Sequence, residues 1–426
     1  MNPRGEQEYG TYGYRWVVLS VYMLVAALTQ LMWLNYAPIT SQTQELMGMS
    51  EFQVVLLATM FPLIYIPVSI PAGIIIDRKG YRYAIMIGAV LTAAFSFLRL
   101  FAGNYPLVLI GMIGISIGQP FVLNGITKLV STWFPTEESA LATGLGALAL
   151  FMGMIVALAV TPALLEAFGE GQLSSLRWIV LIYSLAALAG LILFALLAKA
   201  RPPRPPKRTE QEIVSGEVAI NWKSIRTIFG LHNFRILCVI IFVGNGAFIG
   251  IMQLIEKIME PKGISNDTAG FIGSVVVVAG VVGCIVLPSI SDRIMRRKPF
   301  VLLAAAAAVP TVFLIGALDN TALIYVISGL MGFFLLSAYP VVLAFAEETT
   351  GAALTGTATG ILLLLGNAGG VVLTLVMEGI KGAAGGTSGS FFWAMFFLAV
   401  IFAAVFTVAL WLREPTPQKM GSGTNI

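Results

Sequence analysis

The sequence predicts an all-α membrane protein with twelve transmembrane helices in two pseudo-symmetric six-helix halves. Composition, apolar runs and an internal repeat support this prediction. Of the 426 residues, 58% are hydrophobic and only 11% are charged, whereas roughly a quarter of the residues in a soluble protein carry charge. Apolar runs of about 18 or more residues recur along the chain, and a helix that spans a bilayer needs about 20.

The apolar runs give the predicted spans in order, six before a long polar stretch and six after it. Prolines within these runs are compatible with membrane helices, because neighbouring helices satisfy the freed backbone groups. The predicted spans are 15–37, 52–76, 83–102, 106–131, 139–166, 176–199, 234–257, 267–290, 299–317, 321–346, 354–380 and 390–412. We therefore expect an N-terminal half at 1–199, a cytoplasmic linker at 200–232 and a C-terminal half at 233–426.

The basic residues set the expected orientation. Twelve spans leave both termini on one side, and placing them in the cytoplasm puts 20 of the 25 lysines and arginines inside or at the inner membrane edge. This distribution satisfies the positive-inside rule. We expect a multi-pass protein of the cell membrane with both termini cytoplasmic. The net charge of +4 follows from this topology and does not indicate a nucleic-acid partner.

The two halves repeat short motifs at nearly constant spacing. Asp77 follows the second span and Asp292 the eighth, 215 residues later. "ATGLG" at 142–146 has a counterpart in "ATGIL" at 358–362, at an offset of 216 residues. Two similar halves around a site at the membrane midplane are the architecture of alternating-access transporters.

A charged segment, "GIIIDRKGYR", interrupts the apolar sequence after the second span. Its pattern G-x-x-x-D-R-x-G-x-R, with Gly73, Asp77, Arg78, Gly80 and Arg82 in place, resembles the signature loop of the major facilitator superfamily. The twelve spans and the second copy of the motif extend the resemblance over the whole chain. The resemblance implies a secondary transporter.

We expect this segment to act as a gate. Asp77 can face the positive N-terminal end of the eleventh span across the two halves, and Arg78 and Arg82 can pair with acidic groups or with the last carbonyls of neighbouring helices. Asp292 and Arg293 would act likewise against the start of the fifth span. Such contacts exist only when the cytoplasmic side is closed, and would be worth about 1–3 kcal/mol. The alternative is that the charges only set topology.

Several stretches are similar to a narrower group, the feline leukaemia virus subgroup C receptor (FLVCR)-like carriers of choline, related amines and, as proposed, haem. These stretches are "MWLNYAPIT" at 32–40, "YIPVSIP" at 65–71, "GQPFVLNGITKLVSTWF" at 118–134, "NGAF" at 245–248 and "GTATG" at 356–360. The resemblance implies that Trp33 and Gln119 match residues that cage choline. Asn367 stands where a glutamine is expected, and Glu348 matches an acidic position that we include among the gating residues. Ile249 replaces a caging tyrosine, which weakens a cation–π box.

The residues alone also indicate a midplane site, because polar groups inside spans are costly and therefore functional candidates. The alternative is hydrogen bonding between helices. The candidates are the amide residues Gln119, Asn124, Asn245, Gln253 and Asn367, with Trp33, Tyr36 and Tyr339 as aromatic walls.

The chemistry missing from the predicted spans limits the function. No Asp or Glu lies in the middle of a span, and one histidine with two isolated cysteines predicts no metal site, cofactor or enzyme. We expect a monomeric transporter of a small organic solute, with a choline-like or other amine favoured, that works by alternating access as a facilitative uniporter. The alternatives are a proton-coupled transporter of another organic solute or haem, and a non-transporting sensor on the same fold.

Overall fold

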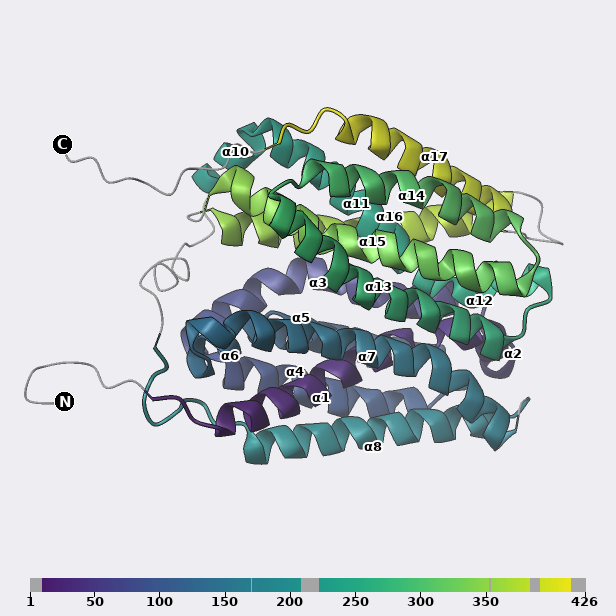
Figure 1. Cartoon of the computed structure of the whole chain (residues 1–426). Helices are drawn as coiled ribbons and strands as arrows, with labels where there is room; N and C mark the ends of the chain where they lie inside the picture. The colour runs from purple at the N-terminus through teal and green to yellow at the C-terminus, as the bar shows by residue number, and fades with distance from the viewer. Residues whose placement is uncertain (1–9, 170, 208–221, 352–353, 384–390, 415–426) are drawn as a thin grey trace, which may run out of the picture.

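The computed structural model describes residues 10–169, 171–207, 222–351, 354–383 and 391–414. Within these ranges, twelve helical segments are long and apolar enough to cross a membrane, which confirms the predicted fold class. The helices form two bundles, one above the other in Figure 1, with α1 beginning and α17 ending at the same end of the molecule. We call that end the termini side and the other end the opposite side.

The first half contains the elements up to α8. They are α1 (Tyr14–Leu34), η1 (Ala37–Ile39), α2 (Thr40–Met47), α3 (Glu51–Lys79), α4 (Tyr81–Ser96), η2 (Phe97–Leu100), α5 (Tyr105–Leu123), α6 (Gly125–Trp133), α7 (Thr136–Phe168) and α8 (Leu173–Leu197).

The second half begins after the described part of the linker, which includes the helix α10. The linker helix is α10 (Trp222–Gly230), and the second half consists of α11 (His232–Gln253), α12 (Ile255–Met259), η3 (Glu260–Lys262), α13 (Asn266–Ile294), α14 (Lys298–Ala317), α15 (Thr321–Thr350), α16 (Thr355–Ala383) and α17 (Phe392–Ala409).

Three predicted spans are interrupted where the sequence predicted continuous helices. The first span ends at Leu34 and continues through η1 into α2, the fourth breaks at Asn124, and the seventh breaks at Leu254. Pro38 in the first turn of η1 has no backbone N–H to continue the hydrogen bonding of α1. The interruptions near Leu34 and Leu254 both lie toward the opposite side.

Equivalent helices pack together in the two halves, as the internal repeat predicts. The first and fifth spans (α1 and α7) contact each other in one half, and the seventh and eleventh (α11 and α16) do so in the other. The second and fourth spans, α3 and α5, correspond in the same way to α13 and α15. The pseudo-symmetry therefore extends from sequence to packing.

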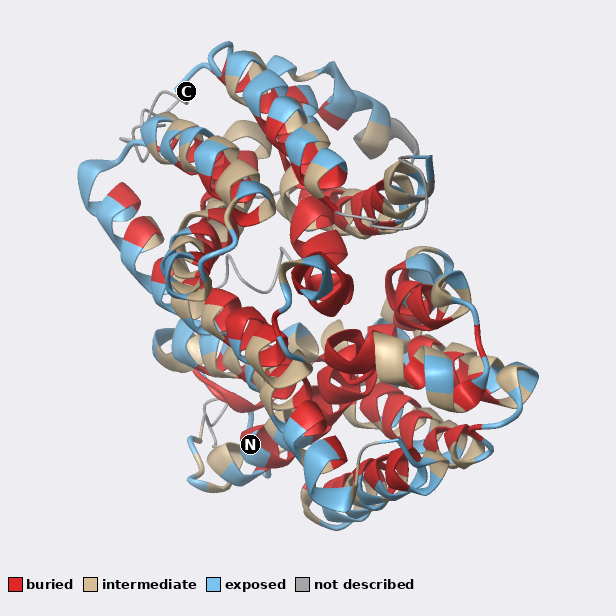
Figure 2. Cartoon of the chain, turned by 90° about the vertical axis from the view of Figure 1, so that its right-hand side faces the viewer, coloured by how far each residue is buried: buried red, intermediate tan, exposed pale blue. Residues whose placement is uncertain are grey.

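The halves meet through α7 on α13 and α3 on α16. At the first contact, a Cβ on Gly270 would lie only 2.2 Å from the carbonyl oxygen of Leu158, so this close approach requires glycine. Ser274 also donates a hydrogen bond to the Ile155 carbonyl at 3.5 Å. Figure 2 looks onto the opposite side and shows buried segments gathered between the two bundles.

Candidate substrate-binding site

A cavity of about 250 Å³ lies between the halves and receives side chains from both. It brings together five residues that the sequence analysis proposed for the substrate. They are Trp33 on α1, Gln119 on α5, Asn245 on α11, Tyr339 on α15 and Asn367 on α16.

Trp33 is held in place as one wall of this cavity. Its indole Nε1–H donates to the carbonyl oxygen of Ala58 at 3.0 Å. The ring stacks on Phe61 with 6.2 Å between centroids and 25° between planes. Because these contacts fix the ring, the indole is pre-oriented to offer a π face to a positively charged group.

The polar lining includes four carboxamides, two from each half. Gln119 is buried, and its Oε1 accepts no hydrogen bond from the described residues. Gln30, three residues before Trp33 on α1, also lines the cavity. The sequence analysis missed Gln30, although a glutamine within an apolar span was a usable signal. In the second half, Asn245 and Asn367 complete the set, with Asn367 Nδ2 donating to the Leu363 carbonyl at 2.9 Å.

The remaining lining is mostly aliphatic with six aromatic side chains, and no charged side chain of the described residues takes part. Ile249 lines the cavity at the position where the family resemblance would place tyrosine, and the preceding residue, Phe248, lines it as well. Helix α11 therefore does present an aromatic ring beside the substituted position.

Two predicted pocket residues lie elsewhere in the first half. Tyr36 is 2% exposed and packs against the Arg99 guanidinium, 4.5 Å from the ring centroid. Asn124, at the break between α5 and α6, accepts a hydrogen bond from the Tyr65 hydroxyl at 2.8 Å and donates to Ser69 at 3.1 Å. Neither residue lines the cavity.

Gln253, the remaining amide candidate, bridges the halves. Its Oε1 accepts hydrogen bonds from Thr59 of α3 at 3.3 Å and from Thr374 of α16 at 3.2 Å. Its Nε2 donates to the Ala58 carbonyl, the same atom that holds Trp33. Gln253 thus connects the pocket wall to the contact between halves.

A polar cluster joins the halves on the opposite side. The Ser41 backbone N–H donates to Glu256 at 3.0 Å, and Lys257 donates to the Ser41 hydroxyl at 2.7 Å and to Glu260 at 3.0 Å. Glu256 is only 1% exposed, and this burial raises the pKa of its carboxyl. An ion pair between Glu51 and Lys381 links α3 to α16 nearby. The opposite side is therefore closed.

On the termini side, the predicted latch residues of the first half do not reach the second. Asp77 and Arg78 are exposed and make no hydrogen bond or ion pair with another described residue. Arg82 donates to the carbonyl oxygen of Ala195 on α8 at 3.0 Å, within the same half. Glu138 at the start of α7 pairs with Arg15 at 2.7 Å.

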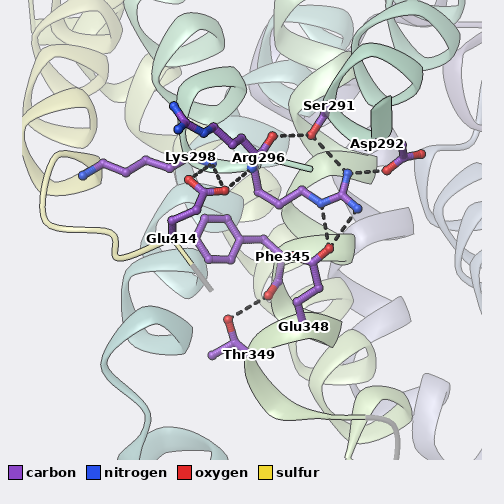
Figure 3. A network of polar contacts seen from close by, with 9 residues as sticks. Ser291, Asp292, Arg296, Lys298, Phe345, Glu348, Thr349 and Glu414 are labelled. Carbon is purple, nitrogen blue, oxygen red and sulfur yellow. Dashed lines mark hydrogen bonds and ion pairs between the residues drawn. The ribbon is translucent and has the colours of Figure 1, made fainter. Parts of the chain in front are cut away.

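The corresponding residues of the second half are organised by Arg297, which was not among the predicted residues; its partners Asp292, Glu348 and Glu414 are labelled in Figure 3. The Arg297 guanidinium pairs with Asp292 and, at 2.8 Å, with Glu348. Glu414 accepts hydrogen bonds from backbone N–H groups of Arg297 and, at 3.2 Å, Lys298. Arg293 is exposed and unpaired within the described residues. These contacts stay inside one half, so none of the predicted latch contacts between the halves is formed among the described residues.

Sequence comparison identifies the class of protein. The profile of the Major Facilitator Superfamily matches residues 18–374, and the chain belongs to this family of membrane transporters. It is therefore a transporter and not an enzyme. No group of three or more His, Cys, Asp and Glu side chains that could hold a metal ion occurs in the described part of the chain.

Several individual membrane transporters are similar to this chain over most of its length. Solute carrier family 49 member A3 from Xenopus tropicalis is 27% identical over 87% of this chain and 79% of its own. The choline/ethanolamine transporter flvcr2b from Danio rerio is 24% identical over 91% of this chain and 82% of its own length. The human choline/ethanolamine transporter FLVCR2 is 23% identical over 90% of this chain and 75% of its own length.

Solved structures agree with the fold. A bacterial homolog of the human lysosomal transporter Spinster, in an inward-facing and unoccupied conformation, superposes with a TM-score of 0.72 at 15% identity. That alignment covers 94% of this chain and 96% of the other. The Escherichia coli fucose:proton symporter FucP superposes with a TM-score of 0.62 at 20% identity, and the alignment covers 94% of this chain and 99% of the symporter.

Proposed function

We propose that this transporter moves a small organic cation, a choline-like or ethanolamine-like amine, across the cell membrane. The observation that carries the proposal is the fixed Trp33 ring beside the carboxamide of Gln119 in one cavity between the halves. An aromatic face attracts an ammonium group, and carboxamides can bond a hydroxyl or N–H group. An anionic solute would find no cationic side chain among the described lining residues.

The size of the cavity supports a small solute. At about 250 Å³ it falls just below the range of roughly 300–1,000 Å³ typical of sites for drug-sized ligands. A compact amine suits this volume better than the haem macrocycle that the family resemblance left open. The names of the choline/ethanolamine transporters FLVCR2 and flvcr2b point to the same class of cargo.

The arrangement of the halves supports alternating access. The cavity lies between them, and the polar contacts of Ser41, Glu256 and Lys257 join them on the opposite side. With both termini cytoplasmic, as the basic residues favour, this conformation is closed toward the outside. The gating residues Asp77, Arg78, Arg82, Asp292, Arg293 and Glu348 would close the cytoplasmic side in the alternate state.

The proposal is tested by uptake of labelled choline and ethanolamine into proteoliposomes that contain the purified protein as a monomer. A facilitative uniporter equilibrates the label and keeps its initial rate when a protonophore collapses the pH gradient at fixed membrane potential. A several-fold loss of rate would instead favour the proton-coupled alternative. Saturable binding without any uptake would favour the sensor, and absence of binding would reject an amine substrate.

A further inference from the structure

Within the part of the chain that the structure describes, Arg99 is a buried cation without an acidic partner. It lies in η2, at the end of the third span on the opposite side, and is 1% exposed. An arginine stays protonated in proteins, and charged residues within membrane proteins are normally paired. The guanidinium donates to Asn35 Oδ1 at 2.7 Å and to Met32 Sδ at 3.2 Å, and it packs over the Tyr36 ring. None of these contacts supplies a negative charge.

Three polar atoms in this cluster have no hydrogen-bond partner among the described residues. They are Arg99 Nε, Asn35 Nδ2 and the Tyr36 hydroxyl. The two nitrogens can only donate, and the hydroxyl can also donate. Their side chains contact one another through the Arg99–Asn35 hydrogen bond and the Arg99–Tyr36 stacking. The group that would complete the cluster is therefore an acceptor that carries negative charge.

Helix α5 leaves space for the buried side chain of Arg99. A Cβ on Gly111 of α5 would lie 2.9 Å from Arg99 Cγ, so the glycine leaves space for the arginine stem. Asn35 and Tyr36 directly follow the helix α1 that carries Trp33. Whatever completes the cluster also fixes the end of this helix.

We propose that Arg99, Asn35 and Tyr36 bind a small monovalent inorganic anion, with chloride as the physiological ion. One negative charge balances the single guanidinium, and the burial of Arg99, Asn35 and Tyr36 favours a small anion. The anion accepts hydrogen bonds from Arg99 Nε and Asn35 Nδ2 and holds the last turn of α1 in place. This site lies in the first half and does not depend on which solute the central cavity carries.

Thermal unfolding of the purified full-length protein tests the site, with chloride exchanged for gluconate at constant ionic strength. The melting temperature should rise by a few degrees as chloride saturates the site, because a ligand that binds only the folded state stabilises it. Bromide should replace chloride, and its anomalous scattering in crystals should place a peak beside Arg99.

Substitutions at Asn35 and Arg99 separate an anion site from simple packing. Asn35→Asp places a carboxylate against Arg99, and this variant should melt in gluconate as the wild type does in chloride, with no further response. Arg99→Met should also lose the response. The control is Lys262→Met, because the Lys262 side chain is largely buried but its ammonium already donates to the carbonyls of Gly316 and Leu318 and pairs with Asp319 at 3.7 Å; this variant should keep the response.

Equal melting temperatures of the wild type in chloride and in gluconate would overturn the proposal, since water would then suffice as the partner of Arg99. A chloride response that persists in Asn35→Asp would also overturn it. The Asn35→Asp comparison decides the matter even if Arg99→Met does not fold.

Discussion

Single substitutions of Trp33 and Gln119 should test whether these side chains bind the substrate. Trp33→Ala and Gln119→Ala should both abolish measurable uptake while leaving folded protein, because each removes a group that contacts the cavity. A desolvated cation–π contact of about 2 kcal/mol corresponds to a loss of affinity of roughly thirtyfold. Trp33→Phe should keep part of the binding through its weaker π face. The measurement is choline and ethanolamine binding and uptake.

The control for Trp33 is Trp393→Ala on α17, where the tryptophan is 55% exposed and is not among the residues that line the cavity. Uptake in this variant should match the wild type. Wild-type affinity in both Trp33→Ala and Gln119→Ala would remove these residues from the substrate site.

Gln30 tests the charge of the substrate. Gln30→Glu adds a carboxylate of nearly the same shape to a cavity without charged lining residues. For a cationic substrate the affinity should increase about tenfold at neutral pH, the effect of ~1.4 kcal/mol of Coulomb attraction. The matched variant Gln30→Met removes the polar group without adding charge. Weaker binding in Gln30→Glu than in Gln30→Met would show that the substrate is not a cation.

The sequence predicted which amide and aromatic residues are unusual, but not the direction in which each one points. Trp33 and Gln119 stand out as polar or amphipathic groups in apolar spans and line the cavity. Tyr36 follows only three residues after Trp33, yet the break of the helix at Leu34 turns it toward Arg99. Asn124 similarly sits at a break and bonds within its own half. Periodicity cannot place side chains where the helix itself is interrupted.

At the scale of whole helices, the prediction concerns α3 and α16. These helices contact each other through Glu51 and Lys381 on the opposite side, while Asp77 at the other end of α3 is exposed. If Asp77 closes the termini side in the alternate state, Asp77→Asn should reduce turnover much more than substrate binding. The population of the closed state should fall about 5–150-fold. Cysteine pairs across the termini-side ends of α3 and α16 report this change by crosslinking.

Asp292→Asn serves as the comparison, because Asp292 occupies the equivalent position but pairs with Arg297 in its own half. This variant should show a weaker version of the same defect. Equal crosslinking in the wild type and in Asp77→Asn would leave the charges of this segment as a topology signal only.

The helical spans themselves were largely predictable, because twenty apolar residues without charge have few alternatives in a membrane protein. The breaks at Leu34, Asn124 and Leu254 were not, since membrane helices tolerate prolines and polar residues without breaking. The contact between α7 and α13 could not be predicted from the sequence either, because Gly270 is one of 44 glycines in the chain and nothing in the sequence distinguishes it.

At the scale of the molecule, pH should shift the balance between the two states through Glu256. In the described state burial raises the pKa of this carboxyl, whereas separation of the halves would hydrate it and return its pKa toward the ordinary range of a glutamate. The closed opposite side therefore binds more protons than the open one. Acid on that side should stabilise closure, and the effect should fade as the pH rises through the raised pKa.

A fluorophore pair on α2 and α12 in proteoliposomes measures this equilibrium as the pH of the opposite side is varied. Glu256→Gln should remain closed at every pH, because the neutral amide can still accept the Ser41 N–H. Glu45→Gln is the control, since Glu45 lies on α2 on the same side but is exposed and should leave the pH response unchanged. A response that survives in Glu256→Gln would assign the titration to another group.

Gly270 lies where a small rotation of α13 would produce a large movement of the other end of that helix. Its backbone contact with Leu158 lies near the start of α13, and Asp292 is 22 residues further along the same helix, about 33 Å at a rise of ~1.5 Å per residue. If the crossing at Gly270 serves as a fulcrum, a tilt of about 10°, within the range of rigid-body motions, sweeps the far end of α13 through about 6 Å. The fulcrum itself scarcely moves. Because the Gly270 contact lies near one end of α13, a small rotation there would open a wide gap between the halves on the termini side.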